Sequence, residues 1–383
     1  MPNDAAPRPD APLTLLGGLT PRRFLKRHWQ RKPLLVRAAL PRFEPLLGRA
    51  QLFALARRAG VESRLVVRDA RGRWTLEHGP FEKAALPPPS QPRWTLLVQG
   101  VDLHHDAAHA LLQSFRFVPD ARLDDLMISW ASDGGGVGPH VDSYDVFLLQ
   151  AAGTRRWRIG RERAPSFVRG SPLKILRRFS PTEEHVLGPG DMLYLPPQWA
   201  HEGVAEGGEC MTYSIGFRAP RRRELAAALL ERLASDSTDE TIYEDARLEA
   251  AKRPAEIPAR LQRFAAAAVH ELLGRDGIDA ALGEIMSEPK PGVTFDEPGK
   301  RWTKGAVVLD RRTRMLYDEH NVYINGDSYR ATGADARVLR RLADTRRLDA
   351  KTVRAASSAA RALLREWCAS GWLWPEGDRE PRE

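Results

Sequence analysis

The chain has few of the features that mark exported, membrane-spanning or cysteine-rich proteins. Its only cysteines, Cys210 and Cys368, lie far apart, which excludes a disulfide framework and a cysteine-rich zinc site. No apolar run approaches the roughly 20 residues that a bilayer-spanning helix requires. The segment Met1–Thr20 carries acidic, proline and glycine residues where a signal peptide has a basic start and an unbroken apolar stretch. We therefore expect an unexported, cytoplasmic protein.

The composition is that of a globular protein with an excess of positive charge. Hydrophobic residues make up 42% and charged residues 28% of the 383 positions, and this length predicts two or three domains. The net charge of +9 favours a nucleic acid or a ribosome-associated partner, because basic surfaces attract phosphate. The preference for Arg over Lys, with abundant Ala, Leu and Pro, is also typical of GC-biased genomes. Both explanations of the charge stay open.

The segment before residue 220 has the pattern of a β-rich domain. Residues 21–40 combine the start of a basic amphipathic helix with a short apolar strand after Pro33, and we interpret them as a cap on a larger domain. The cluster Pro87–Pro89 separates a helical stretch at 51–59 from the β-prone region that begins near residue 94. Short segments rich in β-branched and aromatic residues then alternate with glycine and proline turns, which predicts a sandwich or barrel. These predicted strands are 94–100, 126–132, 145–150, 155–160 and 191–196.

The pattern changes at Pro220. From Arg221 to about Met286 the chain is rich in Ala and Leu at helical spacing, with Gly274 placed as a C-terminal stop, and we expect a small helical domain. Strand segments come after Pro291, and Asn325-Gly326 between apolar residues predicts a hairpin. Two further helices are expected to close the chain. Together these elements predict an α+β module of the winged-helix type.

One glycine-rich stretch and one later segment carry the residues of a metal site. His140 and Asp142 lie two residues apart, so both side chains project from one face if the segment is extended. His201 comes after an apolar strand and the turn at Pro196 and Pro197. Two imidazoles and one carboxylate form the set that holds non-haem iron(II) on one face and leaves three coordination positions open.

The open positions suit a particular chemistry. A 2-oxoacid can chelate the ion through two of them while dioxygen takes the third, and the protein then orients the cosubstrate and the target C–H bond. The distal carboxylate of 2-oxoglutarate needs a fixed cation, which Arg supplies through a bidentate fork. Arg155 is the candidate, with Arg156 and Arg158 as competitors whose ordinary role would be a solvated charge.

Each of these residues also has an ordinary explanation. A lone His-x-Asp pattern is common by chance, and it is the combination with a glycine-rich entry, a downstream Arg and a distant His that favours a metal site. His104 and His105 lack a partner at ligand spacing, so we expect them at the surface or at a helix cap. Cys210 is expected to be a small buried hydrophobe.

Two stretches carry a resemblance to a known family. They run from Asp124, DDLMISWASDGGGVGPHVDSYDVFLLQAAGTRRWRIG, and from Gly188, GPGDMLYLPPQWAHEGVAEGGECMTYSIGFRAP. With weaker support from WQRKPLLVRAA at Trp29, the chain resembles the JmjC-type ribosomal oxygenases over nearly its full length. The resemblance implies a mainly β fold. Its parts are a JmjC cupin (double-stranded β-helix) domain with an N-terminal cap at 1–217, a helical dimerisation domain at 218–290 and a winged-helix-like domain at 291–383.

The resemblance also implies an activity. Members of this family are iron(II)- and 2-oxoglutarate-dependent dioxygenases, and the closest pattern is that of enzymes hydroxylating the β-carbon (C3) of an arginine in large-subunit ribosomal protein L-sixteen. It implies iron ligands at His140, Asp142 and His201, with Arg155 binding 2-oxoglutarate. It further implies substrate contacts at Asp125, Met127, Tyr144 and Ser214, whose ordinary roles would be strand-end charge, core packing and sheet hydroxyl.

Three features bear on partners. The segment 161–185 differs from the family pattern and is placed to reshape the entrance of the site. An apolar stripe of Leu225, Leu229 and Leu233 fits either a homodimer interface or packing within one chain. A basic enzyme must attract a basic ribosomal protein through a local acidic pocket, for which we expect Asp124, Asp125 and Asp145, while its excess positive charge is free to face RNA.

The residues leave alternative functions open. The same chemistry could act on a histidine of another ribosomal protein, which would favour a neutral polar pocket, or on a methylated lysine, which would call for an aromatic cage. A third possibility is a non-catalytic, metal-binding cupin without 2-oxoglutarate turnover.

Overall fold

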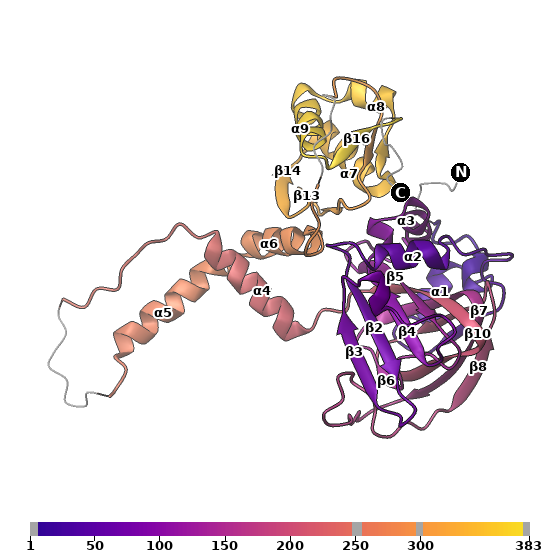
Figure 1. The fold of residues 1–383 in the computed structure, drawn as a ribbon. Helices are drawn as coiled ribbons and strands as arrows, with labels where there is room; N and C mark the ends of the chain where they lie inside the picture. The colour runs from indigo at the N-terminus through magenta and orange to yellow at the C-terminus, as the bar shows by residue number, and fades with distance from the viewer. Residues whose placement is uncertain (1–6, 247–254, 296–301, 378–383) are drawn as a thin grey trace. The chain divides into compact units, whose positions relative to one another are not determined.

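The computed structural model describes residues 7–246, 255–295 and 302–377, which fall into two compact units (Figure 1). The first unit extends from the N-terminal side to Ala219, and the second contains residues 220–291 and most of 295–376. The predicted change of character at Pro220 therefore coincides with the division between the units. In the described residues no helix combines the length and the apolar character that a membrane crossing demands.

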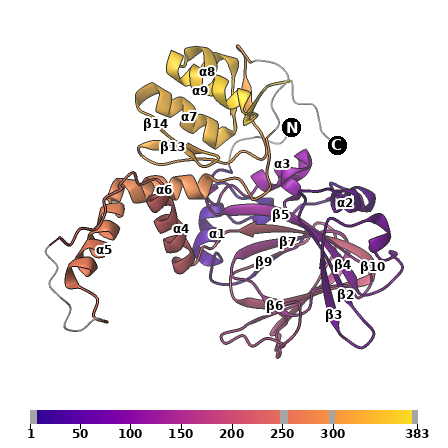
Figure 2. The same cartoon turned by 60° about the vertical axis from the view of Figure 1, so that its left-hand side comes forward.

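The first unit is built on one antiparallel sheet of ten strands that wraps around a core (Figure 2). The strand order is β1-β9-β7-β10-β5-β4-β2-β3, with β6 added to β10 and β8 added to β7. A curved sheet with this content agrees with the predicted JmjC cupin class. The strands are β1 (Leu34–Val36), β2 (Ser63–Arg68), β3 (Trp74–His78), β4 (Trp94–Val98), β5 (Leu123–Ala131), β6 (His140–Val141), β7 (Asp145–Arg161), β8 (Glu183–Leu187), β9 (Met192–Leu195) and β10 (Trp199–Phe217).

The two longest strands, β7 and β10, pair with each other on both sides of a register shift between Glu206 and Thr212. The prediction of separate strands at 145–150 and 155–160 was wrong, because β7 runs through the AAG segment without a break. Gly153 makes this continuity possible: its φ is +63°, and a Cβ there would lie 2.2 Å from the carbonyl oxygen of Glu209. The glycine therefore marks a bend within a strand, where the sequence suggested a turn between strands.

The N-terminal segment caps this sheet as predicted. Helix α1 (Pro21–Arg27) begins at Thr20, whose hydroxyl accepts a hydrogen bond from the amide of Arg23, and it places Phe24 in the core. The Phe24 ring lies 5.0 Å from the ring of Tyr194, and β1 pairs with β9. Removing a fully buried phenyl ring of this kind costs about 3–5 kcal/mol. The other helices here are α2 (Arg49–Leu55), α3 (Asp106–Gln113) and the short 3-10 turns η1 (Thr14–Leu16), η2 (Lys83–Ala85) and η3 (Val101–Leu103).

The second unit combines helices with two small sheets. Its strand orders are β15-β11-β16 and β12-β13-β14. The predicted hairpin is confirmed: Ile324 pairs with Asp327 across Asn325 and Gly326, which both have positive φ. The elements are α4 (Arg222–Ser235), α5 (Ala259–Leu272), α6 (Arg275–Ser287), β11 (Val307–Leu309), β12 (Met315–Tyr317), β13 (Asn321–Ile324), β14 (Asp327–Arg330), α7 (Gly333–Thr345), β15 (Arg347–Leu348), α8 (Ala350–Ala355), α9 (Ser358–Ala369) and β16 (Leu373–Pro375).

Some details of this unit differ from the prediction. Three helices, α7 to α9, come after the hairpin where two were expected. Gly274 does separate two helices, but its φ of −51° makes it the residue before α6 and not a left-handed cap of α5. On α4, Leu233 lies against Gly277 of α6, so this part of the leucine stripe packs within the chain. The domain boundary predicted at residue 291 stays a prediction.

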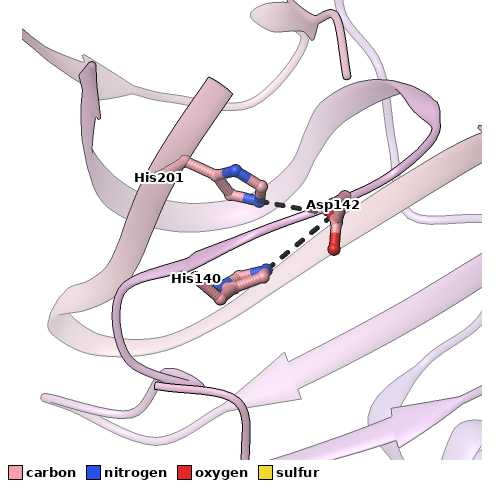
Figure 3. Close-up of side chains that lie close together, drawn as sticks. All are labelled: His140, Asp142 and His201. Carbon is pink, nitrogen blue, oxygen red and sulfur yellow. Dashed lines mark ion pairs between the residues drawn. The ribbon is translucent and has the colours of Figure 1, made fainter. Parts of the chain in front are cut away.

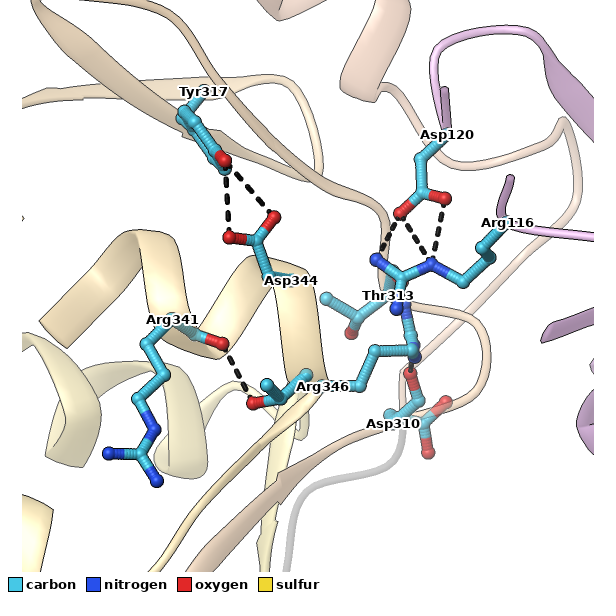
Figure 4. A network of polar contacts seen from close by, with 9 residues as sticks. Arg116, Asp120, Asp310, Thr313, Tyr317, Arg341, Asp344 and Arg346 are labelled. Atoms are coloured by element: carbon cyan, nitrogen blue, oxygen red, sulfur yellow. Dashed lines mark hydrogen bonds and ion pairs between the residues drawn. The ribbon is translucent and has the colours of Figure 1, made fainter. Parts of the chain in front are cut away.

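Polar contacts hold the strands of the second unit to its helices (Figure 4). The hydroxyl of Tyr317 on β12 lies 3.1 Å from both carboxylate oxygens of Asp344 on α7. After α7 ends, Arg346 donates to the carbonyl oxygens of Asp310 and Thr313 at 2.7 and 3.1 Å. The carbonyl oxygen of Asp310 also accepts from the amide of Thr313 at 3.0 Å, so the turn after β11 is held both by its own backbone and by Arg346.

Candidate metal centre and substrate pocket

Strand pairing brings the two predicted imidazoles together. In the short β6–β10 pair, His140 lies directly opposite His201, so both side chains share one face of the sheet. Asp142 is the first residue after β6, and its carbonyl oxygen accepts a hydrogen bond of 2.9 Å from the amide of Gln198. Figure 3 shows the three side chains pointing toward one another.

The ligand atoms of the triad face a common point. Asp142 Oδ2 lies 3.8 Å from His140 Nε2 and 3.6 Å from His201 Nε2, and the ring centroids of the two histidines are 4.2 Å apart. These contacts are too long for direct hydrogen bonds. They suit donors that meet through an ion, and among the described residues this is the group of His, Cys, Asp and Glu side chains whose ligand atoms all lie within 4.8 Å of one another.

Backbone carbonyls orient both rings. Nδ1 of His140 lies 2.9 Å from the carbonyl oxygen of Gly138, and Nδ1 of His201 lies 2.9 Å from that of Trp199. A proton on each Nδ1 then donates to the backbone and leaves the Nε2 lone pair directed at the shared point. Burial, together with nearby His140, lowers the pKa of His201 to about 4, although Asp142 acts against this. The neutral imidazole is the form that binds a metal.

The glycine-rich entry allows the chain to pass close to its neighbours before His140. A Cβ at Gly136 would lie 2.4 Å from the carbonyl oxygen of Gly203 on β10. Gly138 has a φ of +74°, and a Cβ there would lie 2.5 Å from the Ile175 side chain and 3.1 Å from the Trp74 ring. Side chains at these positions would push β6 away from β10 and separate the two histidines.

Arg155 is buried without a counter-ion in the described part of the chain. It is 5% exposed, its Nε lies 3.4 Å from Cys210 Sγ, and one terminal guanidinium nitrogen has no hydrogen-bond partner there. The competitors differ: Arg156 pairs with Glu184 and Glu206, and Arg158 pairs with Glu202. A buried, unsatisfied guanidinium costs stability unless an anion completes it, so Arg155 fits a carboxylate-binding role best.

Trp157 is a site residue that the sequence reasoning missed. Its ring lies 5.7 Å from the Arg155 guanidinium carbon and 5.9 Å from the His201 ring, so it contacts both predicted groups. Gly203 makes room for this ring, because a Cβ there would lie 2.7 Å from it. Arg155 and Trp157 are two residues apart on β7 and therefore share one face of the strand. This spacing could have identified Trp157 from the sequence.

Three of the predicted substrate residues lie on the neighbouring strands β5 and β10, and the fourth, Tyr144, lies in the bend before β7. Met127 on β5 lies opposite Ser214 on β10, and Asp125 lies two residues along β5 on the same face. Desolvation and the nearby carboxylates of Asp142 and Asp125 raise the pKa of the Tyr144 hydroxyl, which places this side chain near both the triad and Asp125. The Tyr144 ring is 39% exposed, as a residue at an entrance would be. We call these four predicted substrate residues, Asp125, Met127, Tyr144 and Ser214, the substrate pocket, and their binding role stays a prediction.

A second missed feature is a chain of hydrogen bonds behind Asp125. Its Oδ2 accepts from Gln99 Nε2 at 2.9 Å and from the amide of Gly100 at 3.0 Å. The Gln99 Oε1 in turn accepts from Arg64 at 3.0 Å, and the same Arg64 nitrogen lies 3.8 Å from Met127 Sδ. Gln99 lies near the end of an apolar, β-prone segment. From the sequence alone it looked like an ordinary polar residue at the end of a strand.

The acidic pocket expected from Asp124, Asp125 and Asp145 does not form as predicted. Asp145 is fully buried in the core, where its carboxylate accepts from Tyr194 at 2.6 Å and from Gln30 at 3.1 Å. Asp124 pairs with Arg218 at 3.3 Å. Asp145 thus belongs to the core and Asp124 to an ion pair, whereas Asp125 lies on the same face of β5 as Met127 and stays a predicted substrate residue.

The ordinary explanations hold for the remaining candidates. The His105 side chain accepts from the amide of Ala108 and caps α3, as expected for a residue outside the site. Cys210 is buried and packs with Ala131 and Ala205, so the prediction of a small buried hydrophobe is confirmed.

Two family models match the chain. A JmjC domain model matches residues 110–225, which include the triad, Arg155 and the substrate pocket. A ROXA-like winged helix model matches residues 268–374, in agreement with the predicted fold of the C-terminal region.

Individual proteins are similar over most of the chain. The ribosomal protein uL16 3-hydroxylase of Escherichia coli K12 is 34% identical over 79% of this chain and 84% of its own length. A probable ribosomal oxygenase of Haemophilus influenzae is 30% identical over 79% of this chain and 72% of its own. The solved structure of E. coli YcfD, a ribosomal oxygenase, in complex with cobalt and 2-oxoglutarate matches with a TM-score of 0.78 and 31% identity, covering 94% of this chain and 99% of that one.

Proposed function

The chain belongs to the JmjC-domain ribosomal oxygenases, and from this premise we propose that it hydroxylates C3 of an arginine in ribosomal protein uL16, using iron(II) and 2-oxoglutarate. The observation that carries the proposal is the triad His140, Asp142 and His201, with its donor atoms facing one point, together with a buried Arg155 that has one unpartnered guanidinium nitrogen. The residues fit the cofactors: two neutral imidazoles and a carboxylate suit iron(II), and a buried guanidinium suits a dicarboxylate.

The triad side chains would hold the ion, and each has a distinct task. An iron(II) ion bound there would supply dioxygen activation, with one oxygen atom entering the substrate C–H bond and the other ending in the acid left after decarboxylation. His140 and His201 hold neutral donors in place through the carbonyl oxygens of Gly138 and Trp199. Asp142 provides the anionic donor, which also offsets the charge of the ion.

Arg155 and Trp157 would hold the cosubstrate. The free guanidinium nitrogen of Arg155 would donate to the distal carboxylate, while the Trp157 ring between Arg155 and His201 would exclude water. Exclusion of water strengthens the charge-assisted hydrogen bond, because the local dielectric constant falls.

The substrate pocket would orient an arginine side chain. Asp125 would pair with the substrate guanidinium, Tyr144 would lie along its plane, and Met127 with Ser214 would form the floor between β5 and β10. Gln99 and the amide of Gly100 hold the Asp125 carboxylate in one orientation. Less conformational entropy is therefore lost when the substrate binds.

The first experiment tests the cofactors. Iron(II) and 2-oxoglutarate are added to the apoprotein without oxygen, and we expect the visible charge-transfer band of the chelate. Arg155→Met should need far more 2-oxoglutarate to give the band, whereas Arg158→Met, a control on the same strand, should match the wild type. Absence of the band in the wild type would refute the oxygenase and leave a non-catalytic cupin.

The second experiment identifies the substrate residue. The enzyme is incubated with peptides of ribosomal protein uL16, iron(II), 2-oxoglutarate and oxygen, and fragments are mapped by mass spectrometry. We expect the gain of one oxygen atom on an arginine. Modification of a histidine, or loss of a methyl group from a lysine, would replace the proposal by one of those activities.

Partners and location are part of the same proposal. An enzyme that acts on a bacterial-type ribosomal protein would work in the cytoplasm, which agrees with the scarcity of cysteine in the sequence. For a homodimer through the helical segment, the support is the exposure of Leu230, Leu261 and Val269 on α4 and α5, because apolar side chains at helical spacing favour a covered face. Sedimentation of the full chain tests it.

A further inference from the structure

The loop between β7 and β8 forms an ordered hairpin at the edge of the metal centre. Phe167 pairs with Leu176, and the amide of Val168 donates to the carbonyl oxygen of Ile175 at 2.9 Å. We call residues 161–178 the basic hairpin. In Figure 2 the loops of this part of the chain extend next to β6.

The basic hairpin is anchored directly beside a triad ligand. The amide of Leu176 donates at 2.8 Å to the carbonyl oxygen of Pro139, the residue before His140. Ile175 and Leu176 are buried, and Ile175 packs on Gly138. The inner strand of the hairpin thus lies against the segment that carries His140.

Six of the twelve exposed residues of the hairpin carry a positive charge. Its one acidic residue, Glu162, uses a carboxylate oxygen to accept from the amide of Ala164. In the described part of the chain none of the cationic side chains has a hydrogen-bond or ion-pair partner, and all are exposed. They are Arg161, Arg163, Arg169, Lys174, Arg177 and Arg178.

The neighbouring acids do not neutralise this charge. Glu184, on the strand after the hairpin, pairs with Arg156, and Glu183 contacts His185 at 3.1 Å. Unneutralised cations on one hairpin repel one another, and an extended polyanion relieves that repulsion. Phe167 adds an exposed aromatic ring, 39% accessible, on which a base can stack.

We propose that the basic hairpin binds the phosphate backbone of RNA next to the metal centre. Positive charge here disfavours long-range attraction of a basic protein, and five of the six cations are Arg, which binds phosphate through a bidentate fork. The identity of that RNA as ribosomal rests on the proposed function: the target arginine would be presented by a ribosomal protein that already contacts RNA.

The test compares two pairs of adjacent arginines in the full chain. Arg177→Glu/Arg178→Glu alters the hairpin, and Arg57→Glu/Arg58→Glu alters an exposed pair after α2 with the same change in net charge. Binding of a fluorescein-labelled oligouridylate is measured by anisotropy over a range of salt. We expect the hairpin variant to lose at least about tenfold in affinity, with its salt slope reduced by about 1.4, at roughly 0.7 per phosphate contact of a single strand.

The outcomes separate this inference from the hydroxylase. Equal losses in both variants would reduce the effect to overall charge, and no RNA binding by the wild type would refute it; either leaves the hydroxylase intact. Equally tight binding of labelled polyglutamate would point to an acidic peptide and overturn the choice of RNA. Peptide hydroxylation is followed in parallel, and a hairpin variant that loses it while keeping RNA binding would assign the hairpin to the protein substrate.

Discussion

At the metal triad the two histidine rings are oriented by backbone carbonyls alone, whereas in the substrate pocket Asp125 is oriented by a side chain together with the amide of Gly100. His140 and His201 are each held by a carbonyl oxygen two residues earlier in the chain. Asp125 is held by Gln99, which is itself held by Arg64 from a third strand. The orientation of the two histidines thus depends on residues next to them in the sequence and should tolerate substitutions elsewhere. The orientation of Asp125 depends on distant residues, and substitutions of these can change which substrate binds.

Asp142→Ala should have the largest effect. It removes the anionic ligand at the backbone-oriented end, and we expect turnover to fall by more than about 100-fold, since even indirect partners of metal ligands cost 10–100-fold. Product formation and iron(II) binding by calorimetry are the measurements. Asp69→Ala, in an exposed turn on the same unit, is the control. Retained iron binding in Asp142→Ala would remove Asp142 from the ligand set.

Arg155→Met should come next. Loss of a buried partner of a charged ligand costs about 2–5 kcal/mol, so we expect the KM for 2-oxoglutarate to rise about 30-fold or more, with iron affinity unchanged. Steady-state kinetics against Arg158→Met, whose guanidinium pairs with Glu202, checks this. An unchanged KM would show that a different cation binds the distal carboxylate.

Asp125→Ala should weaken peptide binding without stopping the consumption of 2-oxoglutarate. We expect the peptide KM to rise about tenfold or more, the usual cost of leaving a cation unpaired in a pocket, while uncoupled consumption of 2-oxoglutarate continues. Oxygen uptake with and without peptide measures both. If the peptide KM stayed at the wild-type value, the guanidinium would not bind at Asp125.

Gln99→Leu tests whether side chains orient the pocket. This residue does not touch the reacting atoms, so the peptide KM should rise less than in Asp125→Ala, by about fivefold, with kcat retained. The double variant with Asp125→Ala should then be no worse than Asp125→Ala alone. Additive losses would mean that Gln99 binds the peptide directly.

Asp145→Asn should have the smallest effect on activity. Its carboxylate lies in the core with Tyr194 and Gln30, so the peptide KM should change by less than about twofold, or roughly 0.4 kcal/mol. Burial raises the pKa of Asp145, so its contribution to stability is present below its unfolded pKa and is lost as pH rises through the folded one. Urea unfolding should therefore show wild type losing stability relative to the variant from pH 4 to 7. A larger KM change would return Asp145 to substrate recognition.

The sequence predicted the triad because its information is local. A His-x-Asp on a strand needs only the alternation of side chains, and His201 was marked by its own turn at Pro196 and Pro197. The curved sheet and the hairpin at Asn325-Gly326 could be predicted from strand periodicity and turn chemistry in the same way.

The errors share another cause. Whether Gly153 ends a strand or bends it depends on Glu209, more than fifty positions away. The fate of Asp145 depends on Tyr194 and Gln30, which meet it only after β1 and β9 have joined the sheet. Buried polar groups are decided by such distant partners, and one sequence read along its length cannot supply them.

The long β7–β10 pairing has a consequence for how related proteins with this fold can vary. The two strands are paired along most of their length, so their amides should be the slowest of the first unit to exchange with deuterium. The part of the sheet that carries His201 is therefore expected to be its most stable part. Loops such as the one joining β7 to β8 can then change in length, charge or sequence without displacing these strands. Related enzymes would then acquire new substrates through changes in these loops, while the metal triad stays the same.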